Sequence, residues 1–185
     1  MPEFIYHIVI FAVSTLAILR GFRLRLSRQI PSLIGFTFGG ICSHIFMDPA
    51  TTIAIELFHI PTGGLRGLYL ASNLAGAAVF AIAYYAFKIC TYLIGLLMRN
   101  HPGDLLDNIA GSFFCMLKYL MLLSVIYNMI LGIGMSPKST LFKYADQDDA
   151  NVVREVMLIS PGILGAESIT DLSHRIQLHE ASKIS

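Results

Sequence analysis

The chain has 185 residues, of which 55% are hydrophobic and 14% are charged, and its mean hydropathy is +0.67. Typical soluble domains carry roughly 25% charged residues, and a domain of this size leaves much of its surface in contact with water. The composition therefore excludes an ordinary soluble domain and indicates that a lipid bilayer is the main partner. A net charge of +1, with no basic patch interleaved with aromatic residues, gives no support for nucleic-acid binding.

Four apolar stretches are long enough, or nearly so, to cross a bilayer as helices, which takes about 20 residues each. They lie at about 4–19, 30–47, 68–88 and 110–134. Unpaired backbone groups are too costly in lipid, and the alternating pattern of a membrane barrel is not present. The predicted fold class is therefore all-α, a polytopic membrane bundle of four transmembrane helices over residues 1–135.

The first stretch is followed by four arginines and no acid: Arg20, Arg23, Arg25 and Arg28. A signal peptide would have a basic region before its apolar run and small residues after it, so we expect this stretch to be retained. By the positive-inside rule, the short arginine loop is a topology anchor on the cytoplasmic side. Alternation of the spans then places both termini on the periplasmic side.

Small residues recur on one face of several spans, at spacings that let helix backbones approach closely in lipid. We interpret these faces as packing surfaces, either within the chain or between copies of it. The alternative is a pore lined by the small faces. The residues are Ser32, Gly35, Gly39 and Ser43 in the second span, Ser72 and Gly76 in the third, and Gly111 in the fourth.

Three polar residues within the spans are candidates for an intramembrane polar site. Lys118 lies near the middle of the fourth span, where an ammonium group costs roughly 2.5 to 3.5 kcal/mol. It either reaches the interface or pairs structurally, or it lines an ion or proton path. Asn128 is predicted to hydrogen-bond between helices. His44 is predicted near the outer end of the second span, where it meets water.

An alternative for His44 is a metal or proton site with Asp48, four residues later, and His59 in the following loop. Such a site would make the chain an intramembrane enzyme. However, no Ser/His/Asp order, HExxH motif or phosphate-binding glycine loop is present. The three cysteines lie singly in apolar segments without metal-ligand spacing. We therefore expect a non-enzymatic protein with no metal and no cofactor.

Two segments outside the spans have a weaker pattern. Residues 54–60 are mildly amphipathic and are predicted to lie at the membrane interface. Residues 136–185 form a polar C-terminal tail, which we expect to be solvated and partly helical. Within it, a short capped helix is predicted after Asp148, ending at Pro161 and Gly162.

The sequence GFRLRLSRQIPSLIG at residues 21–35 resembles the loop of the colicin V production protein (CvpA) family. That loop reads approximately glycine, aromatic, two basic residues, glycine, two residues, basic, acid, then apolar, serine, leucine, any residue and glycine. The chain departs at Leu24 from a basic residue, at Arg25 from a glycine and at Gln29 from the acid. It matches at Gly21, Phe22, Arg23, Arg28, Ser32, Leu33 and Gly35.

The fourth span is also similar to the family pattern, with Gly111 and Lys118 on its glycine and basic positions. Cys115 and Tyr119 replace two further glycines, which predicts a looser helix contact there. The resemblance implies a four-span protein of the bacterial inner membrane that supports production or export of a peptide toxin and upkeep of the envelope. The partners we expect are further copies of the chain or other membrane proteins. The alternative function is a small channel or transporter formed by an oligomer of the bundle.

Overall fold

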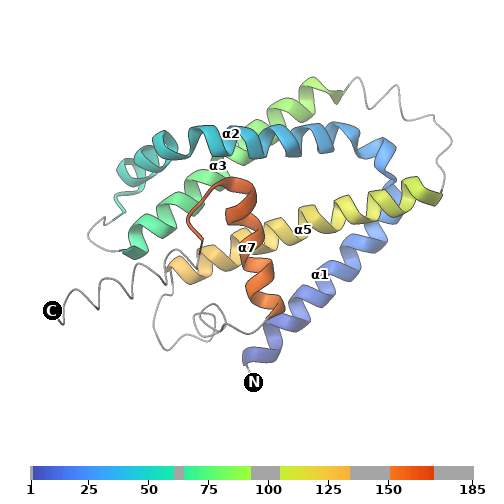
Figure 1. Cartoon of the computed structure of the whole chain (residues 1–185), viewed down its shortest axis with the longest axis horizontal. Coiled ribbons are helices and arrows are strands. Elements are labelled where there is room, and N and C mark those ends of the chain that lie inside the picture. The colour runs from blue at the N-terminus through green and yellow to red at the C-terminus, as the bar shows by residue number, and fades with distance from the viewer. Residues whose placement is uncertain (1, 61–64, 93–104, 134–150, 169–185) are drawn as a thin grey trace.

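The computed structural model describes residues 2–60, 65–92, 105–133 and 151–168 (Figure 1). Within these ranges the chain forms helices and no strand, which confirms the predicted all-α fold class. The helices are α1 (Pro2–Leu24), α2 (Leu26–Phe58), α3 (Leu65–Cys90), α5 (Leu105–Ile133) and α7 (Val152–Leu164).

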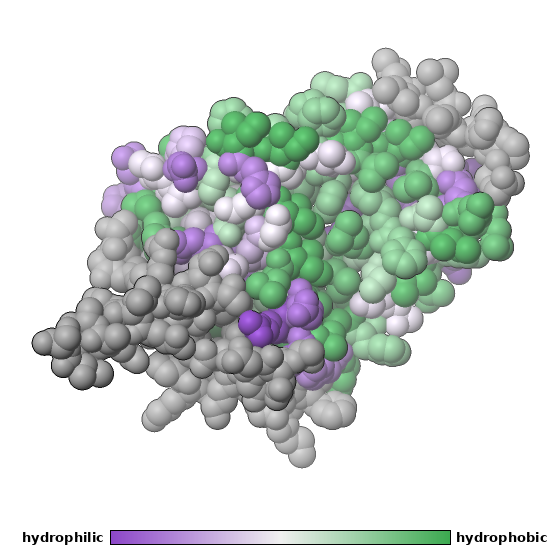
Figure 2. Space-filling model, in the orientation of Figure 1, coloured by the Kyte–Doolittle hydropathy of each residue, from purple (hydrophilic) through white to green (hydrophobic). Residues whose placement is uncertain are grey.

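Four of these helices, α1, α2, α3 and α5, are long and apolar enough to cross a membrane. Large apolar side chains point outward from them, and hydrophobic residues cover much of the visible helix surface in Figure 2. The side chains of Phe11 and Phe113, for example, are 75% and 74% exposed. Water would oppose such exposure over so many residues, whereas lipid favours it. The chain is therefore a multi-pass membrane protein.

The second span is longer than the predicted 30–47, because α2 continues past Pro49 to Phe58. A proline removes one backbone hydrogen bond, but the remaining bonds of the helix hold it together. The helix ends at His59, whose left-handed backbone (φ 50°) turns the chain and lets its N–H bond to the Ile55 carbonyl. Residues 54–58 thus form the C-terminal end of α2, and their position at the membrane interface stays a prediction.

The arginine cluster, which was predicted to lie in a short loop, is almost entirely helical. Helix α1 ends at Leu24, α2 begins at Leu26, and only Arg25 between them is non-helical. Arg20, Arg23 and Arg28 are exposed on the two helices, and Arg25 is half-buried at the turn. The cluster therefore marks one end of the bundle, which we call the arginine end.

The long helices pack as two pairs, α2 against α3 and α1 against α5. The short helix α7 lies across them and contacts all four (Figure 1). Its side chains Val153, Met157 and Leu164 are fully buried, so the prediction of a solvated tail is wrong for this segment. The tail is polar on average over its length, but these three residues recur at helical spacing and give α7 one apolar face.

The ends of α7 also differ from the prediction. Its N-cap is Asn151, whose side-chain oxygen accepts a hydrogen bond from Val153 N at 3.1 Å. Asp148, the predicted start, lies outside the described residues. The helix passes through Pro161 and ends at Leu164, where Gly165 adopts the left-handed conformation (φ 71°). Gly165 N then donates to the Pro161 carbonyl at 2.9 Å, which closes the last turn.

Candidate functional site

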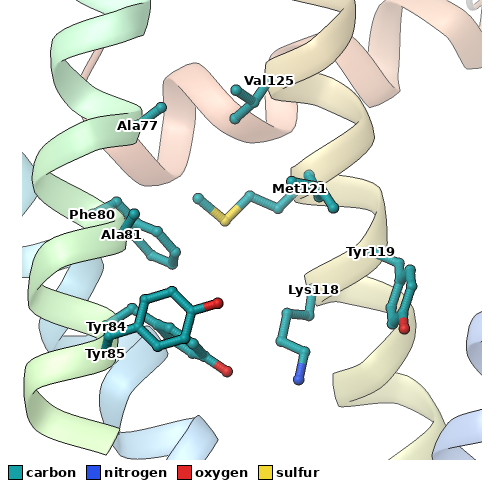
Figure 3. A pocket seen from close by; sticks show the side chains of 10 residues that line it. Ala77, Phe80, Ala81, Tyr84, Tyr85, Lys118, Tyr119, Met121 and Val125 are labelled. Carbon is teal, nitrogen blue, oxygen red and sulfur yellow. The ribbon is translucent and has the colours of Figure 1, made fainter.

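A lateral cavity of about 380 Å³ opens between α3 and α5 (Figure 3). Side chains of Ala77, Phe80 and Ala81 line it from α3, and those of Met121 and Val125 line it from α5. These residues make most of its wall apolar. The cavity exists because the α2–α3 pair and the α1–α5 pair diverge here, while α7 spans the gap beside them (Figure 3).

One end of the lateral cavity is polar. Tyr84, Tyr85 and Lys118 gather there, with the two phenol hydroxyls directed toward α5 and the ammonium at the same level (Figure 3). The Tyr84 hydroxyl also lies 3.1 Å from Ser32 Oγ on α2. Lys88, one turn further along α3, places its Nζ 5.5 Å from the Tyr84 ring centroid and 5.8 Å from that of Tyr85. We call Tyr84, Tyr85 and Lys118 the polar end of the cavity.

Lys118 is half-buried, and its Nζ stands 5.5 Å from the centroid of the buried Phe114 ring. A cation over an aromatic face is attracted by the ring quadrupole, which offsets part of the cost of leaving water. Among the described residues no carboxylate forms an ion pair with it. Its Cα lies about 20 Å along α5 from Leu105, at about 1.5 Å per residue. Lys118 therefore lies in the half of α5 nearer the arginine end, and its side chain lines the cavity.

Asn128 lies at the centre of a second polar group, which joins α5 to α7 and α3. Its Nδ2 donates to the Met157 carbonyl at 2.8 Å and to Ser160 Oγ at 3.1 Å, and its Oδ1 accepts from the Tyr69 hydroxyl. Ser124 completes the group by accepting from Ser160 N at 2.9 Å. Asn128 thus hydrogen-bonds between helices, and we call Tyr69, Ser124, Asn128, Met157 and Ser160 the α7 network.

Pro161 explains why the α7 network is needed. A proline cannot donate to the carbonyl four residues earlier, which here is that of Met157. The released carbonyl accepts hydrogen bonds from Asn128 Nδ2 at 2.8 Å and from Ser124 Oγ at 3.0 Å. A buried carbonyl without a partner would cost about 1 to 3 kcal/mol. The side chains of α5 therefore replace the bond that Pro161 removes and allow the helix to continue.

His44 lies away from the end of its helix, because α2 extends to Phe58. Its side chain is exposed, and its Nε2 lies 3.3 Å from the Gly162 carbonyl near the end of α7. His59 forms the C-cap of the same helix. Within the described ranges, no group of three or more His, Cys, Asp or Glu side chains is placed to hold a metal ion. The structure thus places His44 as a contact to α7.

The small-residue faces of α2 and α3 are occupied within the chain. A methyl group added at Gly35 would lie 2.6 Å from the Tyr84 carbonyl oxygen, and one at Gly39 would lie 3.0 Å from the Phe80 ring. Ser43 Oγ lies 3.1 Å from the Gly76 carbonyl and 2.8 Å from that of Leu164. Ser72 Oγ bonds to the Tyr69 carbonyl at 3.1 Å. These faces therefore bring α2, α3 and α7 together.

At the arginine end, Gly111 packs against the turn between α1 and α2. A methyl group there would lie 2.8 Å from the backbone of Arg25 and 2.9 Å from the Gly21 carbonyl oxygen. A methyl group at Gly21 would in turn lie 2.7 Å from the Cβ of Cys115. The predicted looser contact at Cys115 is therefore wrong, because the opposing glycine leaves room for the cysteine.

Asp107 adds a polar contact to this crossing. Its Oδ1 accepts a hydrogen bond from Ser27 N at 2.8 Å, in the first turn of α2, where backbone N–H groups lack helical partners. A carboxylate is also stabilising at a helix N-terminus. Gln29 Nε2 donates to the Gly111 carbonyl at 3.4 Å. We call Gly21, Arg25, Asp107 and Gly111 the arginine joint.

Sequence reasoning missed several of these residues. Tyr84, Tyr85 and Lys88 form a cluster of hydroxyl groups and a cation at one end of a span, and that clustering was an available signal. The capping role of Asp107 carried no signal, because it depends on which helix lies next to α5. Ser124 and Ser160 are small polar residues in apolar helices, and only Pro161 hints at the carbonyl that they surround.

The chain matches a known family along most of its length. The pattern of the colicin V production protein family matches residues 6–147, which include most of α1 and all of α2, α3 and α5 but not α7. No curated protein and no solved structure matches the chain. The family match confirms the resemblance seen at residues 21–35 and covers far more than half of the 185 residues. The chain therefore belongs to the colicin V production protein family.

Proposed function

We propose that this chain is a non-enzymatic component of the bacterial inner membrane that supports production or export of a peptide toxin and upkeep of the cell envelope. The observation that carries the proposal is the family match over residues 6–147, which takes in the four membrane-crossing helices. The deep polar side chains add support. Asn128 and Ser43 hydrogen-bond to neighbouring helices, and Ser72 Oγ accepts from Glu167 N after α7, as expected for a packed scaffold.

The orientation we propose places the arginine end in the cytoplasm and the N-terminus on the periplasmic side. Three exposed arginines and the half-buried Arg25 gather at this end. The positive-inside rule supports this orientation, because Lys and Arg in short segments are retained on the cytoplasmic side. With four crossings, the segment that contains α7 then follows on the periplasmic side.

A complementation experiment tests the role in toxin production. A colicin V-producing bacterium lacking its own family member would express this chain, and toxin in the medium and survival in detergent would be measured. We expect both to be restored. Gly111→Leu, which blocks the arginine joint, should fail, whereas Gly162→Ala should succeed because its Cβ meets no atom within 4 Å. Equal toxin release with and without the chain would refute the role in toxin production.

We also propose that copies of the chain, or the chain and other membrane proteins, associate through lipid-facing surfaces. The small faces at Gly35 and Gly39 are already occupied by Tyr84 and Phe80 of the same chain. Cysteines introduced along this stripe should therefore crosslink within one chain only. A monomer in native membranes, measured by crosslinking at exposed positions such as Phe113, would contradict association.

A small channel or transporter is the second candidate, and the lateral cavity with Lys118 at its polar end favours it. Protein reconstituted in vesicles should then conduct or take up a solute. Lys118→Leu should change the selectivity because it removes the cation from the cavity, whereas Lys118→Arg should preserve it. Absence of flux under tension, voltage and a pH gradient would count against this candidate.

A further inference from the structure

The lateral cavity is polarised along the membrane-crossing direction. Tyr84 and Lys118 lie toward the arginine end of α3 and α5, and Ala77 and Val125 lie toward the opposite end (Figure 3). The polar end is on that side because α3 runs toward Cys90 and α5 starts at Leu105, beside the arginine joint. The cavity thus has a cationic and hydroxyl-bearing end near one leaflet and an apolar wall leading into the membrane.

The charge at the polar end is positive and uncompensated among the described residues. Lys118 reaches the cavity, and Lys88 stands over the rings of the same two tyrosines. None of the residues that line the cavity is an acid. An ammonium held in apolar surroundings favours an anionic partner strongly, since each charge alone is poorly solvated there.

We propose that the lateral cavity binds an anionic phospholipid from the leaflet at the arginine end. The phosphate group would lie at Lys118, with the hydroxyls of Tyr84 and Tyr85 as hydrogen-bond donors. One acyl chain would follow the wall formed by Phe80, Ala77, Met121 and Val125. Basic pockets between membrane helices recognise acidic lipid headgroups by the same physics.

The size and access of the cavity fit this ligand. Its volume of about 380 Å³ lies within the range of roughly 300 to 1,000 Å³ typical of small-molecule sites, so it can take a headgroup or part of an acyl chain. Tyr85 and Leu122, which line it, are 60% and 59% exposed on the outer face of the bundle. A lipid can therefore enter from the side. This inference goes beyond the role proposed above and does not rest on it.

A tryptophan reporter tests the proposal, because the chain has no tryptophan of its own. Ala81→Trp places the reporter on the cavity wall at an exposed position, and Phe113→Trp places it on the exposed face of α5, outside the cavity lining. The full-length protein would be reconstituted in vesicles of phosphatidylcholine and phosphatidylglycerol, with bromine on the acyl chains of one lipid at a time. Bromine quenches tryptophan fluorescence on contact.

We expect phosphatidylglycerol to be preferred over phosphatidylcholine about fivefold at Ala81→Trp, the effect of one lysine near an acidic headgroup. At Phe113→Trp the two lipids should quench nearly equally. Adding Lys118→Leu should remove the preference at Ala81→Trp, and Lys118→Arg should retain it. Leucine is the more favourable residue in a membrane helix, so Lys118→Leu should not prevent folding.

Two results of the vesicle experiment, and one further result with a fatty acid, would overturn the proposal. One is an equal lipid preference at both reporter positions, and the other is a preference that survives Lys118→Leu. Quenching by a brominated fatty acid without any preference for phosphatidylglycerol would also overturn it, because the site would then recognise a carboxylate. Vesicle quenching reads lipid contact alone, so its outcome is independent of whether the chain supports toxin production.

Discussion

Arg25 has a backbone conformation that is unusual for any residue other than glycine. Its φ of 56° and ψ of 148° lie in a region that non-glycine residues avoid, because the Cβ atom collides with the backbone. The family pattern has a glycine at this position. The departure from the pattern therefore coincides with the one residue that joins α1 to α2. Arginine here adds a charge to the arginine end and strains the turn.

Replacing Arg25 with glycine should stabilise the fold. Backbone strain of this kind costs about 1 to 3 kcal/mol, which Arg25→Gly would relieve. The greater conformational freedom of glycine in the unfolded chain offsets roughly 0.5 to 1 kcal/mol of this gain. We expect Arg25→Gly to raise the unfolding temperature of detergent-solubilised protein, with a gain of about 1 kcal/mol. Arg23→Gly, inside α1, is the matched control and should lower the free energy of unfolding by about 1 kcal/mol. Equal losses in both variants would show that the turn is unstrained.

Gly111 has no room for a side chain, since an added Cβ would lie 2.8 Å from the backbone of Arg25. Backbone cannot move aside as a flexible side chain can. We expect Gly111→Ala to destabilise the protein by about 1 to 3 kcal/mol, measured by the same thermal unfolding. Gly162→Ala is the control, because no atom lies within 4 Å of its added Cβ and alanine favours the helix. A neutral Gly111→Ala would mean that the arginine joint is loosely packed.

At the scale of elements, α7 is stabilised by polar side chains of α5, which replace a hydrogen bond that a proline removes from the helix. Pro161 leaves the Met157 carbonyl without its helical donor, and Asn128 and Ser124 of α5 donate to it instead. The tertiary contact and the local helix are thus energetically linked. Two substitutions, one in each helix, should therefore not be additive.

We expect Asn128→Ala to destabilise the fold by about 2 to 4 kcal/mol. The substitution removes the hydrogen bonds that Asn128 makes to the Met157 carbonyl and to the Tyr69 hydroxyl, both of which are buried. In a Pro161→Ala background the same substitution should cost about 1 kcal/mol less, since residue 161 can then donate to that carbonyl. Denaturant unfolding of the four proteins in detergent measures this coupling. Asn108→Ala is the control, because its Oδ1 lacks a partner among the described residues. Additive losses for Asn128→Ala and Pro161→Ala would refute the linkage.

The sequence predicted the existence and order of the four long helices, because apolar length alone defines a membrane span. It did not predict the ends of α2, since Pro49 and the polar residues after it look like a loop until the helix is seen to continue. It also missed the burial of α7. An apolar face over thirteen residues is a weak signal within a polar tail. Its burial also depends on Ser124 and Asn128, which lie in a distant segment of the sequence.

At the scale of the whole molecule, the two helix pairs are linked at separate places. The arginine joint holds α1, α2 and α5 together, and α7 bridges all four helices elsewhere (Figure 1). Between these links the pairs diverge, and the lateral cavity opens there. Lys118 could be singled out from the sequence because a lysine is rare within a span. Tyr84 and Tyr85 form a visible polar cluster at the end of the third span, but their position beside Lys118 depends on how α3 packs against α5 and could not be predicted.

The orientation of this arrangement decides which leaflet reaches the cavity. A membrane potential of 100 mV, negative inside, opposes placing the four arginines outside by about 9 kcal/mol, at about 2.3 kcal/mol per charge. In a variant whose three cysteines are replaced by serine, Glu56→Cys at the far end of α2 should therefore react with an impermeant maleimide on intact cells. Arg28→Cys should react only after the cells are permeabilised. Both positions are exposed, so burial cannot account for a difference. The reverse labelling pattern would show that the bundle has the opposite orientation, with the lateral cavity open to the periplasmic leaflet.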